Sequence, residues 1–188
     1  MITNLKMKLL IFDQGMTEQV YAGRKTMARV YMERQPSMPS HVVFSEVEDA
    51  MLKDARGSVH LFPYKRTFPL REWWRRAGHG FEYKTDGIDP DGKWTNPTNL
   101  PLKAARMWLE ITEVYCERFS EISGTEFDAE GIKPAKDIGL PSYWDYTRKM
   151  YSAKTKQESI ESYYMSKIPN LRREQWGWVI HFQPMTAL

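Results

Sequence analysis

The sequence contains a single cysteine, Cys116, and no long run of apolar residues. One cysteine excludes an intramolecular disulfide and a cysteine-based zinc site, so a reducing compartment, the cytoplasm, is expected. The apolar run near the start, Leu9 to Phe12, is too short for a membrane-spanning helix or for the core of a signal peptide. We therefore expect a cytoplasmic protein without a membrane partner.

Motifs of metal and cofactor sites are also missing. The four histidines, His41, His60, His79 and His181, do not show the spacing of metal ligands. The stretch DGIDPDG lacks the spacing and the terminal glutamate of a calcium loop. The chain has neither a P-loop nor the glycine pattern of a dinucleotide-binding site. The sequence thus predicts no metal and no cofactor.

Neither sign of charge dominates the composition. The chain has 27 Lys and Arg against 24 Asp and Glu, a formal net charge of +3, which is a smaller excess than in dedicated duplex-DNA-binding proteins. Any nucleic-acid-binding surface must therefore be local. The 188 residues, of which 41% are hydrophobic and 13% aromatic, suffice for one well-filled core. We expect a single domain over residues 1–188.

The N-terminal pattern predicts a strand, a short helix and a basic loop. Residues 8–13 (KLLIFD) read as a buried strand. The helix follows over residues 16–23, with Thr17 as its N-cap and Gly23 as its left-handed end. The loop AGRKTMARV then places three cations within six positions.

Further helices are predicted at three places. Two stretches, SEVEDAMLKDARG and SGTEFDAEGI, combine a capping box with a terminal glycine, Gly57 in the first and Gly131 in the second. Residues 142–168 have helical spacing and many polar residues, which predicts one or two surface helices. The capping pairs are Ser45 with Glu48 and Ser123 with Glu126.

Two strongly alternating stretches predict strands. ARMWLEITEVYCERF, residues 105–119, reads as one long strand, and QWGWVIHF, residues 175–182, as another. Residues 84–101, rich in Gly, Pro, Asn and Asp, read as a loop. Short strands with helices between them predict an α+β fold built on a small, mostly antiparallel β-barrel with peripheral helices, because closing the sheet removes its unpaired edges.

Six segments, in this order, resemble ASCH-domain proteins, particularly phage and prophage members: AGRKTMAR, LREWW, YKTDG, KWTNPTNLPLKAARMWLEITEVYCERFSEIS, DAEGI and WGWVIHF. The resemblance covers residues 8–28, 70–132 and 174–184, and leaves insertions at about 31–69 and 135–172. It implies a PUA-like β-barrel. In a phage-encoded protein, the compartment would be the host cytoplasm.

The resemblance also implies a cleft bordered by the first helix and the basic segment after it, with RNA or nucleotide ligands. An Arg binds phosphate through its planar fork and a Lys as a point charge, while an aromatic ring can stack on a splayed base. We expect RNA, another single-stranded nucleic acid or a nucleotide to bind there. The expected binding residues are Arg24, Lys25, Thr26, Arg29, Trp73 and Arg106.

A structural interpretation of the same residues stays open. Lys and Arg side chains at a helix end stabilise the helix dipole and keep a surface hydrated. Adjacent tryptophans on a strand, Trp73 and Trp74, would face opposite ways, and large aromatics usually pack in the core. Glu130, followed by Gly131, would be an exposed carboxylate at the end of a helix.

A hydrolase is the alternative function. A bacterial branch that resembles this family hydrolyses N4-acetylcytidine with a Lys and a Thr from a GRKTxT motif and a Glu from the helix after the long strand. Lys25 and Glu130 match the first and last of these, and are the expected catalytic residues. Ala28 stands at the threonine position, so the presumed nucleophile is missing. A Lys and a carboxylate can still act as general acid and base, as in a ribonuclease.

The insertions leave a third function open. They would make the protein a phage protein-interaction module on the same barrel.

Overall fold

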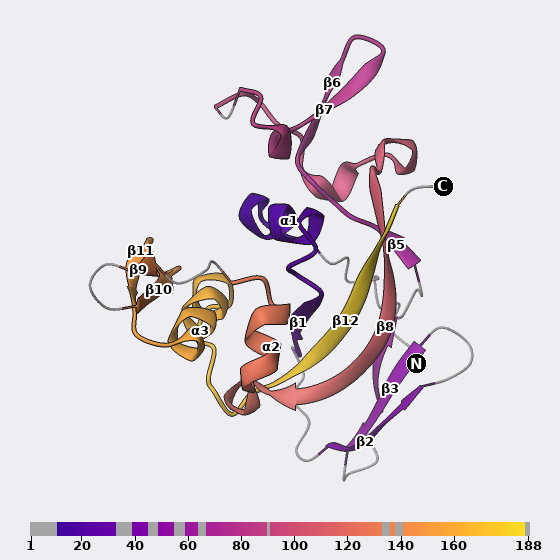
Figure 1. Ribbon diagram of the computed structural model, residues 1–188. Helices are drawn as coiled ribbons and strands as arrows, with labels where there is room; N and C mark the ends of the chain where they lie inside the picture. Colours follow the sequence, from indigo (N-terminus) through magenta and orange to yellow (C-terminus); the bar gives the residue numbers. More distant parts are fainter. Residues whose placement is uncertain are drawn as a thin grey trace.

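Two long antiparallel strands, β8 (Met107–Arg118) and β12 (Trp176–Thr186), form the centre of the computed structural model (Figure 1). The strand β1 (Met27–Tyr31) pairs with β12, and β5 (Thr67–Pro69) pairs with β8, so the strand order is β1-β12-β8-β5. The strands predicted from the alternation of apolar and polar residues are confirmed as β8 and β12. The structure describes residues 11–32, 39–44, 49–54, 59–63, 67–89, 91–132, 136–137 and 141–186.

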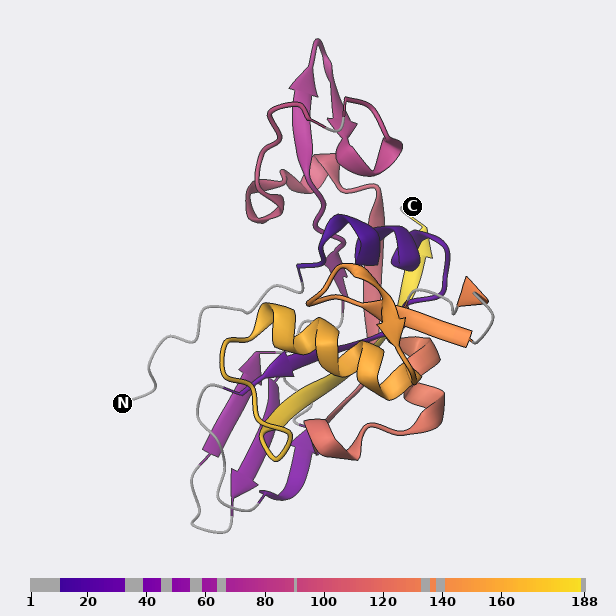
Figure 2. The ribbon, with the colours of Figure 1, turned by 90° about the vertical axis from the view of Figure 1, so that its left-hand side faces the viewer.

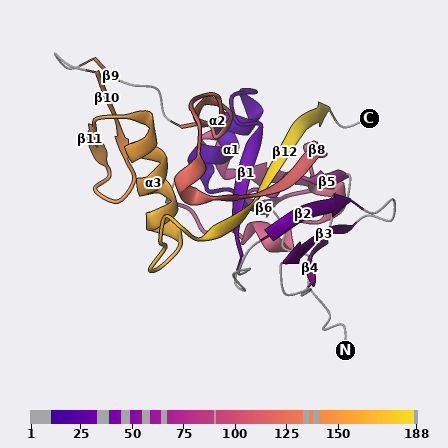
Figure 3. The ribbon, with the colours of Figure 1, turned by 90° about the horizontal axis from the view of Figure 1, so that it is seen from below.

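Three smaller antiparallel sheets surround the central one. Their strand orders are β2-β3-β4, β6-β7 and β11-β10-β9. The β2–β4 sheet lies on one side of the long strands and α3 on the other (Figures 1 and 3), while the hairpin β6–β7 projects from the rest of the molecule (Figure 2). The bounds are β2 Pro39–Phe44, β3 Asp49–Asp54, β4 Val59–Pro63, β6 Trp74–Ala77, β7 Gly80–Tyr83, β9 Lys136–Asp137, β10 Pro141–Asp145 and β11 Met150–Ala153.

The helix α1 (Gln14–Tyr21) begins at Asp13, whose Oδ1 accepts a hydrogen bond from the Met16 N–H at 3.0 Å. The prediction of Thr17 as the N-cap is wrong, because Thr17 lies inside the helix, where its hydroxyl donates to the Asp13 carbonyl. The predicted end is confirmed: Gly23 has φ +68°, a left-handed conformation that glycine adopts without a Cβ clash.

The helix α2 (Gly124–Ala129) also agrees with its prediction. Ser123 and Glu126 form the capping box, and Gly131 follows the helix with φ +69°. The third helix, α3, spans Lys156–Lys167, and short 3-10 turns cover Lys84–Asp86, Pro97–Asn99, Leu102–Ala104 and Phe119–Glu121.

Three predicted helices or strands, the last of them over residues 142–168, are wrong or hold only in part. The helix predicted in SEVEDAMLKDARG is wrong over Asp49–Asp54, which form β3. Pairing with a strand on each side there outweighs the local helix signal; the predicted capping pair and Gly57 lie outside the described residues. Of the strand predicted over residues 8–13, residues 8–10 lie outside the described part, and residues 11–13 make only one bridge, Ile11 with Arg71.

In residues 142–168, the two strands β10 and β11 precede α3, so only the second half of that helical prediction holds. The helix is at the surface, as predicted, and exposes side chains such as Met165. It buries several side chains, among them Ile160, Tyr163 and Tyr164, in the main core. That core also receives side chains from α1, α2 and the long strands, for example Val20, Phe127 and Phe182.

The fold class is therefore mixed helix and strand with mostly antiparallel sheets, as expected. Within the described residues the central sheet is open, since no strand joins β1 to β5.

Candidate functional site

Lys25 and Glu130, 105 residues apart, meet where the turn after α1 crosses the end of α2. The Thr26 N–H donates to the Ala129 carbonyl at 2.8 Å, and Lys25 forms an isolated antiparallel bridge with Glu130. The turn is also held to α1, because the Lys25 N–H donates to the Gln19 carbonyl at 3.1 Å. The backbone thus fixes both side chains at one point.

The Lys25 ammonium is buried against Glu130. Its Nζ donates to the Glu130 carbonyl at 2.8 Å and to the carboxylate Oε2 at 3.1 Å, and the two side chains are 1% and 2% exposed. The Tyr164 hydroxyl on α3 contacts both carboxylate oxygens at 2.8 Å and accepts a hydrogen bond from the Arg29 N–H. The interpretation of Glu130 as an exposed helix-end carboxylate is therefore wrong.

Arg29 completes a buried ion cluster on β1. Its guanidinium contacts Glu130 Oε1 at 2.5 Å, Glu117 Oε2 at 2.8 Å and Glu126 Oε2 at 3.3 Å. We call the five residues, Lys25, Arg29, Glu117, Glu126 and Glu130, the ion cluster. It holds three carboxylates against two cations, so Lys25 and Arg29 already have their counter-charges inside the protein.

Burial sets the proton affinities in the ion cluster. Desolvation lowers the pKa of Lys25 below its ordinary value, against the opposing effect of Glu130. Desolvation also acts to lower the pKa of Arg29, but Glu130 and Glu117 outweigh it and leave that pKa raised. Burial, together with Glu130, raises the pKa of Tyr164 well above its ordinary value, so its hydroxyl stays protonated. Lys25 is thus the cation that releases a proton most readily.

The lowered pKa of Lys25 makes stability depend on pH. Between that pKa and the ordinary value of 10.5 the unfolded chain binds more protons than the native one, so the free energy of unfolding rises with pH. A Lys25→Met variant lacks this contribution. We expect the free energy of unfolding of the wild type, minus that of the variant, to increase as the pH rises from neutral toward 10.5, by about 1.4 kcal/mol for each unit by which the pKa is lowered.

Urea denaturation of both proteins across that range measures this difference. Lys154→Met, at an exposed lysine, is the control. The difference in free energy of unfolding between the wild type and this variant should depend less on pH. A wild-type minus Lys25→Met difference that stays constant with pH would contradict the lowered pKa.

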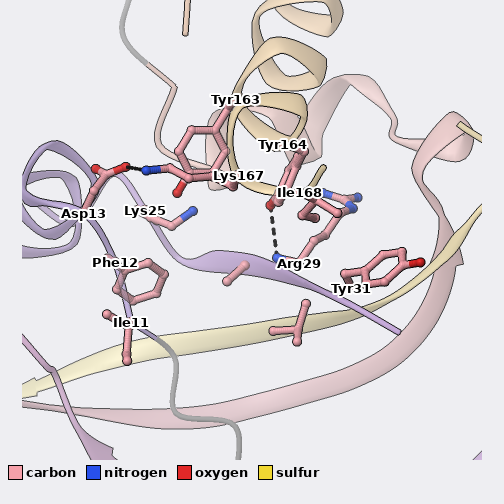
Figure 4. Close-up of a pocket in the computed structure, with 12 residues that line it drawn as sticks. Ile11, Phe12, Asp13, Lys25, Arg29, Tyr31, Tyr163, Tyr164, Lys167 and Ile168 are labelled. Carbon is pink, nitrogen blue, oxygen red and sulfur yellow. Dashed lines mark hydrogen bonds and ion pairs between the residues drawn. The ribbon is translucent and has the colours of Figure 1, made fainter. Parts of the chain in front are cut away.

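A pocket of about 320 Å³ lies beside the ion cluster, between β1, the start of α1 and the end of α3 (Figure 4). Aromatic rings and three cations line it, and Ala28, the position of the threonine in the resembling hydrolases, forms part of its wall. The size is at the lower end of the range for small-molecule sites. The lining residues are Ile11, Phe12, Asp13, Lys25, Ala28, Arg29, Val30, Tyr31, Tyr163, Tyr164, Lys167 and Ile168.

Of the predicted binding residues, Lys25 and Arg29 line this pocket, whereas Arg24, Thr26 and Trp73 do not. Arg24 is exposed, and its Nε donates to Gln19 Oε1 at 2.6 Å. Thr26 acts through its backbone, and Trp73 is half-buried next to the hairpin β6–β7.

Arg106 belongs to a different cluster. Its guanidinium pairs with Glu72 and Asp86, both at 2.7 Å, and lies over the Tyr83 ring, 3.9 Å from the centroid. Glu72 is 1% exposed. Arg106 therefore holds the segment around the hairpin against the body of the protein, and does not extend the positive charge of the pocket.

Sequence reasoning missed the contribution of α3. Four lining residues, Tyr163, Tyr164, Lys167 and Ile168, come from the end of this helix, inside the insertion at 135–172 that the resemblance leaves unexplained. The adjacent tyrosines were the available signal, since two large amphipathic side chains near a helix end suit a partly buried polar site. Glu117 was also missed, because it was counted only as one of the polar positions that alternate with apolar ones along the long strand.

The chain matches no protein-family model, no curated protein and no solved structure. Among the described residues, no group of three or more His, Cys, Asp and Glu side chains has the geometry to hold a metal ion. None of the described helices is long and apolar enough to cross a membrane.

Proposed function

We propose that the pocket beside the ion cluster binds a nucleotide, either free or at an exposed position of a single-stranded RNA. The observation that carries the proposal is the convergence of aromatic rings and fixed cations on one small cavity. Phe12, Tyr31 and Tyr163 line the pocket, and stacking of a base on an aromatic ring adds affinity without regard to sequence. Arg29 Nε is a buried donor without a partner among the described residues, so the wall of the pocket holds an unused hydrogen-bond donor.

The proposal includes membership of the ASCH-domain class with its PUA-like barrel. The motif order supports it, and so does the contact between Lys25 and Glu130, the two residues that match the catalytic Lys and Glu of the resembling hydrolases. The proposed site is smaller than the basic cleft expected from the sequence. It is a pocket for a single nucleotide, and Arg106 lies outside it.

Filling the pocket tests the proposal. In an Ile168→Trp variant the indole would occupy the cavity, so we expect binding of ribonucleosides, ribonucleotides and short RNA to weaken about tenfold or more. Ile88→Trp, at an exposed isoleucine, is the matched control and should bind as the wild type does. Isothermal titration measures the affinities, and thermal shifts show that both variants fold.

Unchanged affinity of Ile168→Trp for every ligand would place the site elsewhere. Absence of any binding by the wild type would overturn the proposal itself.

One observation favours hydrolysis as a second candidate function. Lys25, with its lowered pKa, lies 3.1 Å from the Glu130 carboxylate at the wall of the pocket, an arrangement suited to general acid-base work. Incubation with N4-acetylcytidine and with a mixed RNA pool tests it. A product formed by the wild type and lost in Lys25→Ala supports an enzyme, and Ala28→Thr examines whether the missing hydroxyl limits the reaction. No product from either the wild type or Ala28→Thr would contradict it.

A further inference from the structure

The three cations that line the pocket differ in their availability to a ligand. The side chains of Lys25 and Arg29 are each 1% exposed and contact carboxylates of the ion cluster. Lys167, in the last turn of α3, is 47% exposed and contacts one carboxylate, that of Asp13, at 3.0 Å. A negatively charged group entering from solvent therefore meets Lys167 first.

The pair of Lys167 with Asp13 spans the pocket from the end of α3 to the start of α1 (Figure 4). Both side chains are more than a third exposed, and ion pairs of this kind contribute little to stability, so a competing anion can replace one partner. The Tyr163 ring centroid lies 5.7 Å from the Lys167 ammonium, a cation–π contact that does not depend on Asp13.

Asp13 can give up Lys167 without loss of its structural role. Its Oδ1 caps α1 through the Met16 N–H, whereas Oδ2 makes the contact with Lys167. A phosphate would compete with Oδ2 alone, and the helix cap would remain. The same carboxylate also repels an anion at this position, so it acts against ligands that carry too little charge to displace it.

We propose that the ligand of this pocket carries a terminal phosphate, which replaces Asp13 on Lys167 while its base and sugar occupy the cavity. This rests on the proposed nucleotide-binding function and deepens it, because it gives a role to the insertion at 135–172: α3 selects phosphorylated ligands over nucleosides. A phosphate has three oxygens and a greater charge than one carboxylate, which favours the exchange. Lys167 is then the residue that determines specificity.

Titration of the wild type with the four common ribonucleosides and their 5′-monophosphates tests the inference. We expect at least one monophosphate to bind about tenfold more tightly than its nucleoside. In Lys167→Gln this preference should fall to about one, because the affinity for the monophosphate falls more than the affinity for the nucleoside. In Asp13→Asn, which keeps a good helix cap, the affinity for the monophosphate should rise several-fold and the preference over the nucleoside should grow. Lys154→Gln, at an exposed lysine away from the pocket, should behave as the wild type.

The outcomes separate the two proposals. Equal affinity of the wild type for nucleoside and monophosphate, or a preference that survives in Lys167→Gln, overturns the phosphate inference and leaves nucleotide binding in place. Failure of nucleosides, monophosphates and short RNA alike to bind overturns both. A preference for the monophosphate that disappears in Lys167→Gln and grows in Asp13→Asn supports the inference. Loss of a merely structural salt bridge would change the affinities for nucleoside and monophosphate equally.

Discussion

Replacement of Glu130 by Gln lowers the free energy of unfolding by about 3–5 kcal/mol, the range for breaking a buried ion pair by removal of one partner. The carboxylate is the one described group that contacts both Lys25 and Arg29, and its side chain is 2% exposed. Its loss leaves the Lys25 ammonium buried without a counter-charge. Urea denaturation at neutral pH measures the change, and Glu174→Gln, at an exposed glutamate, should lie within about 0.5 kcal/mol of the wild type.

A double variant shows whether the buried charge is the cause. Lys25→Met combined with Glu130→Gln removes both partners, so we expect it to be more stable than Glu130→Gln alone. The account of the ion cluster would be wrong if Glu130→Gln lowered the free energy of unfolding by less than about 1 kcal/mol. It would also be wrong if the double variant were less stable than both the wild type and Glu130→Gln.

Gly131→Ala has the second large expected effect, a loss of about 3 kcal/mol. Gly131 has φ +69°, where a non-glycine residue costs about 1–2 kcal/mol. An added Cβ would also lie 2.7 Å from the Lys25 Cβ and 3.0 Å from the Gln19 Cβ, and such overpacking costs about 1–3 kcal/mol. Glycine is required here because the chain passes directly against the turn that carries Lys25.

Gly23→Ala separates the two causes. Gly23 has nearly the same angle, φ +68°, but nothing within 4 Å of an added Cβ, so only the conformational cost applies. We expect thermal or urea unfolding to show a loss of about 1–2 kcal/mol for Gly23→Ala and a larger loss for Gly131→Ala. Equal losses would mean that the contact with Lys25 relaxes without cost. In that case the tight placement of the site would not depend on Gly131.

Local patterns predicted the elements that depend on local causes. Alternation identified β8 and β12, because a half-buried strand imposes a period of two wherever it lies. A capping box and a terminal glycine identified α2, since both act within one turn. The same signal at Ser45 and Glu48 predicted a helix where β3 forms, because pairing with the neighbouring strands β2 and β4 decided the outcome there.

Only the site residues that belong to a recognisable sequence motif could be predicted. Lys25 and Glu130 were paired through the resemblance, and the structure places them in contact. Arg106 was grouped with them on charge alone, yet the buried Glu72 holds it in another cluster. Tyr164 and Lys167 reach the pocket because α3 folds back onto β1 from 135 residues away, and no local pattern encodes that return.

The strand order β1-β12-β8-β5 has a consequence for the order of events during translation. Residues 176–186 lie between β1 and β8, so the ribosome releases both neighbours long before the strand that joins them. Until then β1 lacks β12, its neighbour among the described strands, and an unpaired strand edge invites association with other chains. The edge of β1 that pairs with β12 therefore stays open to other chains until residues 176–186 have been synthesised and have paired with it.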